Sequence, residues 1–243
     1  HPSGVGGKIA AMRLLALDTA TEACSVALLL GDTLLARYEE PRRGHAELIL
    51  PMVDELLAEA GIGLGALDCL AVGRGPGTFT GVRIGVSVAQ GLAFGADRPI
   101  VPVSDLAALA QRGVQTHRAT RVLACLDARL GELYWAAFEK GADGLVTALT
   151  DERVGTLATV TAPMEGEWFG VGTGWTAHPA LTTHLRQGGV NLTGTDGTLR
   201  PRAHEIARLA ARDFRAGRAV APEQALPVYV RDSVTVISRK SQS

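Results

Sequence analysis

Short apolar runs separated by tight turns fill the first forty residues and predict strands. The runs are Arg13–Asp18, Ala23–Leu30 and Leu34–Tyr38. Their close spacing is typical of an antiparallel meander. From His45 to Ala60 the apolar residues instead recur every three or four positions, which predicts an amphipathic helix that ends at Gly61.

A glycine-rich turn then links a buried strand to a helix. The strand Leu67–Gly73 runs into the loop Gly73–Gly81 (GRGPGTFTG), a helix follows at about Thr80–Gly95, and Ile100–Val103 is again strand. Strand, helix and strand in this order predict a βαβ crossover, so part of the sheet is parallel. Ser104 or Asp105 can cap a helix that begins near Leu106.

The second half of the chain begins like the first. Ala124-Cys125-Leu126-Asp127 repeats Leu15-Ala16-Leu17-Asp18 after 109 residues, and a short turn and another strand follow each acid. One repeat of this length predicts two similar α/β domains, each with a mixed sheet and flanking helices. We place the domains at residues 12–115 and 116–233. The second contains a weakly patterned stretch at Gly141–Glu167, a strand and glycine turn at Trp168–Gly174, and a helix at His204–Phe214.

The two ends of the chain fall outside this fold. Residues 1–11 have no initiator Met and are expected to be a cloning remnant, with Met12 as the native start. Residues 234–243 are expected to form a flexible tail.

Composition narrows the function class. Of 243 residues, 47% are hydrophobic and 20% charged, which excludes a disordered chain. Lys+Arg 24 against Asp+Glu 25 gives a net charge of -1, without the basic excess of an autonomous nucleic-acid binder. The three cysteines form no CxxC pair, and no apolar run is long enough for a membrane span. We therefore expect a reduced, cytoplasmic protein that is not anchored in a membrane.

Two short segments could bind phosphate. Asp18 and Thr19 end the first strand in a turn of the kind that two-domain ATPases lay against phosphate, although Ala20 stands where such a turn usually has glycine. Gly75 and Gly77 belong to the loop before the second helix, whose N-terminus could bind an anion. A capped turn and a loop with unusual backbone angles explain the same residues without a ligand.

A stripe of small residues marks the second predicted helix. Gly81, Gly85 and Ala89 lie at i, i+4 and i+8, which lets another element approach closely. The stripe could receive a partner helix, together with the apolar face at Leu48–Leu57, or it could pack on the chain's own sheet; the pattern favours neither. Metal-ligand spacings of histidine and a GxSxG nucleophile motif are both absent from the sequence.

Three segments carry a close resemblance to a known family. They are LLALDTATEACSVAL at 14–28, HAELILPMVDELL at 45–57 and AVGRGPGTFTGVRIGVSVAQGLAF at 71–94. The chain resembles the TsaB (YeaZ) family from Arg13 to about Ser233, least at 141–199. The long GRGPGTFTGVRIG run makes a chance match improbable.

The resemblance implies a fold of two duplicated actin-like domains, as in Hsp70 and sugar kinases. It implies a role in making N6-threonylcarbamoyladenosine (t6A) at adenosine 37 of tRNAs that read codons beginning with A. Members of this family are non-catalytic partners of TsaD, which performs the transfer, and they act with the ATPase TsaE. The resemblance implies indirect tRNA contact through the complex and no tightly bound cofactor except ATP or ADP at the TsaD boundary. An apolar docking face would be exposed when the chain is alone, so we also expect a homodimer through the same patch.

The resemblance also suggests which residues dock TsaD and which have lost chemistry. The candidate interface residues are Leu48, Met52, Leu56, Gly81, Gly85 and Ala89, and a Gly85→Leu variant is expected to lose TsaD while staying folded. TsaD-like proteins carry two metal-binding histidines where this chain has Asp105 and Leu109, so the metal site is expected to be incomplete. The alternative is a nucleotide-dependent phosphotransferase or ATPase that uses Asp18 and the Gly73–Gly81 loop.

Overall fold

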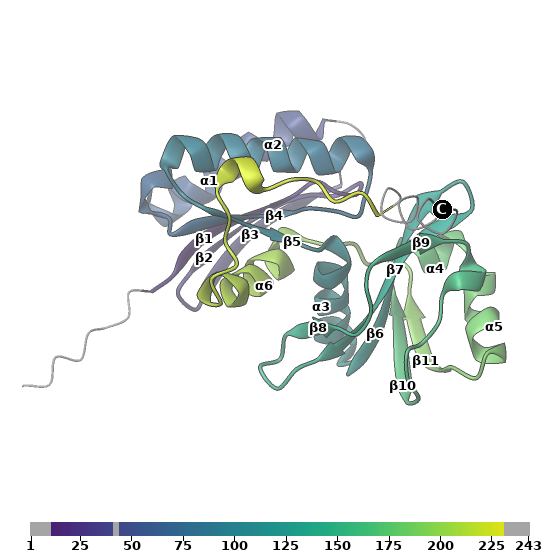
Figure 1. Cartoon of the computed structure of the whole chain (residues 1–243). Helices are drawn as coiled ribbons and strands as arrows, with labels where there is room; N and C mark the ends of the chain where they lie inside the picture. Colours follow the sequence, from purple (N-terminus) through teal and green to yellow (C-terminus); the bar gives the residue numbers. More distant parts are fainter. Residues whose placement is uncertain (1–10, 41–43, 231–243) are drawn as a thin grey trace, which may run out of the picture.

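A computed structural model describes residues 11–40 and 44–230, which form two lobes (Figure 1). The first lobe is built on a five-stranded sheet of order β3-β2-β1-β4-β5. Strands β1 (Arg13–Asp18), β2 (Cys24–Leu30) and β3 (Thr33–Glu39) form the expected antiparallel meander. Strands β4 (Cys69–Gly73) and β5 (Ile100–Val103) run parallel to β1, so the predicted βαβ crossover is confirmed.

Helices cover both faces of this sheet. Helices α1 (His45–Ala60) and α2 (Phe79–Ala96) lie on one face, and α6 (Ala203–Arg215) lies on the other (Figure 1). The alternation along β1 explains why both faces need cover. Leu15 and Leu17 pack into the core under α1 and α2, whereas Leu14 and Ala16 pack into the core under α6.

The second lobe repeats the pairing scheme of the first. Its sheet has the order β11-β10-β6-β7-β8, and β9 pairs with β7. The first two strands again form an antiparallel hairpin, and the first strand again pairs in parallel with a strand that follows later in the chain. The elements are β6 (Arg121–Arg129), β7 (Glu132–Lys140), β8 (Val146–Ala148), β9 (Arg153–Gly155), β10 (Glu167–Val171), β11 (Asn191–Asp196), α4 (Thr173–Ala177) and α5 (Ala180–Gln187). The predicted duplication of two α/β domains is thus confirmed.

Two helices tie the lobes together. Helix α3 (Asp105–His117) follows the first sheet in sequence but packs on β6, β7, β8 and β10 of the second. Helix α6 comes after the second sheet but packs back on the first, and the segment behind it pairs Val220 with Ile100. The division at 115/116 stays a prediction about sequence order, because the packing of these two helices crosses it.

The sequence pattern was least informative between 141 and 199. The strand predicted from Trp168 is present as β10. The other three strands and the two helices in this range, including α5 and β11, were not predicted. Short 3-10 turns lie at Leu64–Ala66, Leu157–Thr159 and Pro222–Gln224. The expected cloning remnant at 1–11, apart from Ala11, and the expected tail at 234–243 lie outside the described residues. Within the described ranges no helix is long and apolar enough to cross a membrane.

Candidate functional site

The turn after β1 and the glycine loop after β4 meet at the junction of the lobes. Thr19 Oγ1 donates a hydrogen bond to the Gly81 carbonyl at 2.7 Å, and the Thr78 N–H donates to the Ala20 carbonyl at 2.8 Å. The four residues predicted as a phosphate turn, Asp18, Thr19, Gly75 and Gly77, are therefore brought together. Backbone groups of the turn and of the loop face each other.

Close approach explains most of the glycines in this loop. A Cβ atom at Gly77 or Gly81 would collide with the carbonyl oxygen of Ala20 or of Thr19, respectively. Gly75 is different, because its φ of 100° lies in the region that favours glycine. The loop needs glycine for its own packing, which is the ligand-free explanation that the sequence left open.

Two buried carboxyl groups meet beside this loop. Asp18 Oδ1 accepts a hydrogen bond from the Ala20 N–H at 2.8 Å, and Asp105 Oδ2 accepts one from the Gly75 N–H at 2.6 Å. A Cβ atom at Gly73 would touch both side chains, so only glycine fits between them. Within the described ranges, Asp18 Oδ2 and Asp105 Oδ1 are buried without a hydrogen-bond partner. One shared proton would supply the donor that both atoms lack.

The environment of the pair favours that proton. Burial raises the pKa of the Asp18 carboxyl from 3.8 to about 6, although the hydrogen bond from Ala20 opposes the rise. Burial and the negative charge of Asp18 raise the pKa of Asp105 well above its ordinary value. Two carboxylates in contact in a dry site cannot both be charged at low cost.

Leu109 has no donor atom for a metal, although it aligns with the second metal-binding histidine of TsaD-like proteins. Leu109 is fully buried in α3 and packs against Gly172, where a Cβ atom would come too close to its side chain. The Asp105 carboxylate is already used by the Gly75 N–H. Among the residues described, no three His, Cys, Asp or Glu side chains are grouped to hold a metal. The donor set therefore does not fit the metal site of that family.

A cavity of about 510 Å³ opens between the lobes in front of the turn. Thr21 and Thr78 line it from the first lobe, and Asp127 and Thr173 from the second. At its edge Glu22 accepts contacts from Arg129 and Arg200, both at 3.4 Å. No sequence pattern predicts these pairs, because only the folded chain brings residues so far apart together.

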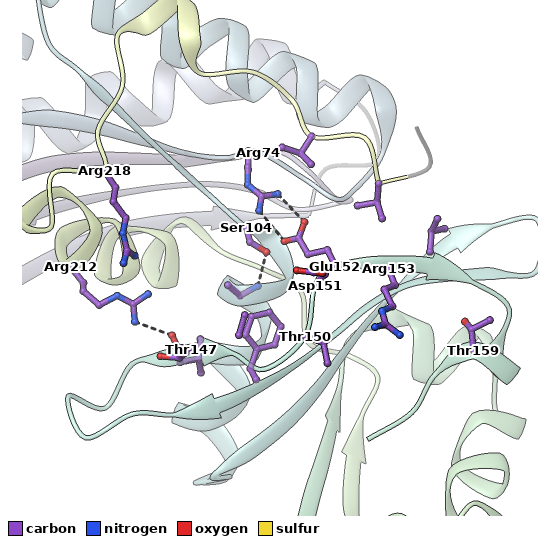
Figure 2. Close-up of a pocket in the computed structure, with 17 residues that line it drawn as sticks. Arg74, Ser104, Thr147, Thr150, Asp151, Glu152, Arg153, Thr159, Arg212 and Arg218 are labelled. Atoms are coloured by element: carbon purple, nitrogen blue, oxygen red, sulfur yellow. Dashed lines mark hydrogen bonds and ion pairs between the residues drawn. The ribbon is translucent and has the colours of Figure 1, made fainter. Parts of the chain in front are cut away.

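A larger cavity of about 1030 Å³ lies between β4, β5 and α6 of one lobe and β7–β9 of the other. Figure 2 shows the Arg74 guanidinium directed at the Glu152 carboxylate, with contacts of 2.9 and 3.1 Å across the lobes. Arg212 and Arg218 lie at one end of the view and Arg153 at the other. No spacing in the sequence pointed to this cavity.

The structure corrects the candidate interface. Gly81, Gly85, Ala89, Met52 and Leu56 are all buried inside the first lobe. A Cβ atom at Gly85 would lie 2.7 Å from Thr19 Oγ1 and 3.6 Å from Val72. The stripe of small residues therefore packs on the chain's own turn and sheet, and Gly85→Leu would disturb the monomer itself. The prediction that these five residues form a docking surface for a partner was wrong.

Leu48 is the one predicted interface residue that is still accessible, and α2 carries a further row of accessible apolar residues. Leu48 on α1 is half-buried, as are Ile84, Val88 and Leu92, which lie at i, i+4 and i+8 on α2. We call these four residues the α1–α2 seam. Leu50 on α1 and Phe94 at the end of α2 are exposed by 44% and 80%. Helices α1 and α2 thus do offer an apolar surface, made of other residues than those expected.

Comparison with known proteins places the chain in a family. A family model described as TsaD, tRNA N6-adenosine threonylcarbamoyltransferase, matches residues 38–167. The tRNA threonylcarbamoyladenosine biosynthesis protein TsaB of Escherichia coli (strain K12) is 45% identical over 226 residues, which cover 92% of this chain and 96% of that protein. The chain belongs to the TsaB family.

Other TsaB-family proteins agree over nearly the whole length. The TsaB protein of Haemophilus influenzae is 40% identical, with 92% of this chain and 95% of that protein covered. The structure of YeaZ from Pseudomonas aeruginosa matches with a TM-score of 0.83 and 46% identity, over 90% of this chain and 99% of that one. The TsaB relatives are named for the biosynthesis of threonylcarbamoyladenosine in tRNA.

Proposed function

We propose that this chain is a non-catalytic subunit required for making t6A at adenosine 37 of tRNAs that read codons beginning with A. The observation that carries the proposal is the shared name of its TsaB relatives, which are 40% and 45% identical over 92% of the chain. In this proposal the chain acts in the cytoplasm as a heterodimer with TsaD and together with the ATPase TsaE. Its contact with tRNA is then made within that complex.

The junction of the lobes supports a role without phosphoryl chemistry of its own. Asp18, the acid that an ATPase would direct at a metal, faces Asp105 in a fully buried pair. The Ala20 N–H donates to Asp18, and the Gly75 N–H donates to Asp105, so neither is free for phosphate. A phosphate would have to break these contacts to reach the turn.

The competing candidate is a nucleotide-dependent phosphotransferase or ATPase that uses Asp18 and the Gly73–Gly81 loop. The cavity of about 510 Å³ beside the turn is the observation in its favour. Calorimetry of the purified chain with Mg-ATP separates the two candidates. We expect no tight binding, and any ATP or ADP is expected at the boundary with TsaD. Micromolar binding that Asp18→Ala abolishes would support the enzyme.

We assign the docking of TsaD to the α1–α2 seam. Three of its four residues, Leu48, Val88 and Leu92, also pack against the core below, so the seam is held on a rigid base. An accessible apolar stripe on two neighbouring helices suits another helix pair, which can bury it by ridges and grooves. In the absence of TsaD, a second copy of the chain could cover the same seam as a homodimer.

A charge in the seam tests the docking. Ile84 is half-buried and lies outside the core clusters, so Ile84→Glu should leave the chain folded. We expect it to abolish co-purification with TsaD, because the partner would have to bury an unpaired carboxylate. The matched control is Thr183→Glu, which adds the same charge at an exposed position of α5 in the second lobe. Undiminished TsaD binding by the folded Ile84→Glu variant would remove the assignment.

The role itself is tested in the host cell. Depletion of this chain should lower t6A in bulk tRNA, measured by mass spectrometry of nucleosides. Wild-type chain should restore t6A, and the Ile84→Glu variant should not. Unchanged t6A after full depletion would refute the proposed function.

A further inference from the structure

Helix α6 presents a row of arginines to solvent. Residues 200–218 contain six arginines and only two acids, although the whole chain has a net charge of -1. Arg208, Arg212 and Arg215 lie at i, i+4 and i+7, so they share one face of α6, and Arg218 follows just after the helix. We call these four residues the basic ridge.

The ridge carries more positive charge than its surroundings neutralise. Among the described residues, the ion pairs of the ridge are all made with Asp213: Arg212 and Arg218 bind Asp213 Oδ1, at 3.3 and 2.8 Å. In the described part of the chain, Arg208 and Arg215 have no carboxylate oxygen within 4.0 Å, and both are exposed. The other acid of the segment, Glu205, is fully buried and is bound by Arg202 and His204.

The ridge continues into the cavity of about 1030 Å³. Arg212 and Arg218 line one end of that cavity, and Arg153 lies at the other end (Figure 2). Arg153 stands over the Trp135 ring at 5.4 Å, with no acid bound to it in the residues described. Hydroxyl groups of Ser104, Thr147 and Thr150 lie between the two ends (Figure 2). Cationic groups thus extend from the face of α6 into a cavity whose lining also includes Asp151 and the Arg74–Glu152 pair.

Helix stability alone does not account for this arrangement. Cations in the last turn of a helix interact favourably with its dipole, which explains Arg212 and Arg215. Arg208 stands before the last turn and Arg218 stands beyond the helix, where that effect has faded. The two outer arginines of the ridge therefore call for another explanation.

We propose that the basic ridge binds the phosphate backbone of RNA, namely the tRNA on which the complex acts. This inference rests on the proposed function and adds a direct tRNA contact to it. Guanidinium groups bind phosphate oxygens through two parallel hydrogen bonds. Arg208 and Arg215 are about 10 Å apart along the helix axis, which matches about three nucleotides of a stacked strand.

The surroundings of the ridge favour RNA over other polyanions. No large hydrophobic side chain of α6 is exposed in the described residues, whereas a membrane-binding helix needs an apolar face to insert. The centre of a protein interface likewise needs aromatic or aliphatic anchors, which the ridge lacks. A phosphate backbone with its sugars needs only cations and hydroxyl groups, and these are present.

The test compares two variants with the same loss of charge. Arg208→Gln/Arg215→Gln removes the two unpaired arginines of the ridge. Arg118→Gln/Arg186→Gln removes two exposed arginines, at the end of α3 and on α5. Binding of an unmodified tRNA transcript to the full-length chain is measured by filter retention between about 50 and 200 mM salt.

We expect the ridge variant to bind tRNA on the order of 30-fold more weakly at about 0.1 M salt, because each phosphate contact contributes about 0.8 to the salt slope. The slope of log K against log salt should fall by about 1.5, and the control variant should keep both values. Unchanged affinity and slope in the ridge variant would overturn the proposal. Equal competition by poly-glutamate would also overturn it, because the ridge would then be a site for an acidic polypeptide.

Two further readouts separate this proposal from the proposed function. Helix α6 lies on the opposite face of the first sheet from α1 and α2, so the ridge variant should still co-purify with TsaD (Figure 1). Normal t6A after depletion of the chain would refute the proposed function. The binding measurement on the ridge variant would still test whether the ridge binds RNA. Loss of tRNA binding in both double variants would refute the assignment of RNA binding to the basic ridge, and it would leave the proposed function unaffected.

Discussion

Replacement of Asp18 by asparagine should stabilise the chain at neutral pH. Asparagine keeps an oxygen for the Ala20 N–H and gains an amide N–H for Asp105, so it reproduces the protonated acid. In the wild-type chain Asp18 loses its proton above about pH 6, and the fold then holds an ionised carboxylate at a buried site. The pKa rise from 3.8 to about 6 corresponds to about 3 kcal/mol, at 1.36 kcal/mol for each pH unit.

The sign of the pH dependence follows from linkage. The folded chain binds the proton more tightly than the unfolded chain, because burial raises the pKa of Asp18 in the folded state. The stabilisation from protonation is therefore complete below about pH 4 and is lost as the pH rises to about 6. Asp18→Asn should match the wild type near pH 4 and exceed it by about 3 kcal/mol at pH 7.

Urea unfolding of both proteins across this pH range measures the effect. The difference between the two free energies of unfolding cancels all groups that titrate alike in both. It should grow between about pH 4 and 6 and then stay constant. A variant less stable than the wild type at pH 7, or a difference independent of pH, would refute the raised pKa of Asp18.

Three further substitutions probe contacts around the same junction. Glu205→Gln should have the opposite effect to Asp18→Asn. Burial raises the pKa of Glu205, but hydrogen bonds from His204 and Arg202 outweigh burial, so the pKa is lowered. The variant should therefore lose about 2 kcal/mol of unfolding free energy at pH 7, and this loss should shrink at low pH, where Glu205 of the wild type becomes protonated. A pH-independent loss in urea unfolding would contradict that sign. Gly85→Ala should cost the chain about 1–3 kcal/mol, since its Cβ would lie 2.7 Å from Thr19 Oγ1, and unchanged urea unfolding would mean that α2 moves aside freely. Ser104→Ala should lower stability by about 1 kcal/mol by removing the cap that accepts the Ala107 N–H at 3.1 Å, whereas Ser104→Asp, which can cap, should not.

The sequence predicted the first lobe well because local signals there agree with the packing. Helix α1 has the predicted bounds, and β1 runs from Arg13 to Asp18 as expected. The echo of Asp18 at Asp127 predicted the duplication, since the same hairpin recurs in both lobes. Between 141 and 199 the strands are short and half-buried, so their alternation is too weak to detect in the sequence.

The candidate site was less accessible to sequence reasoning. A stripe of small residues shows that something approaches closely, but it does not show what. Gly85 contacts Thr19 of the turn after β1, more than sixty positions earlier, and only the fold identifies that neighbour. The Arg74–Glu152 pair could not be predicted because it joins the two lobes. The basic ridge could not be predicted because its exposure depends on how α6 packs against the first sheet.

The exchange of α3 and α6 between the lobes has a consequence for dissection of the molecule. A cut after residue 115 would leave the first fragment with one bare side of its sheet, because α6 would be made with the other piece. That other piece would in turn lack the helix that covers β6 and β7. Neither half should fold by itself, and the two expressed together should reassemble into one particle that melts in a single transition.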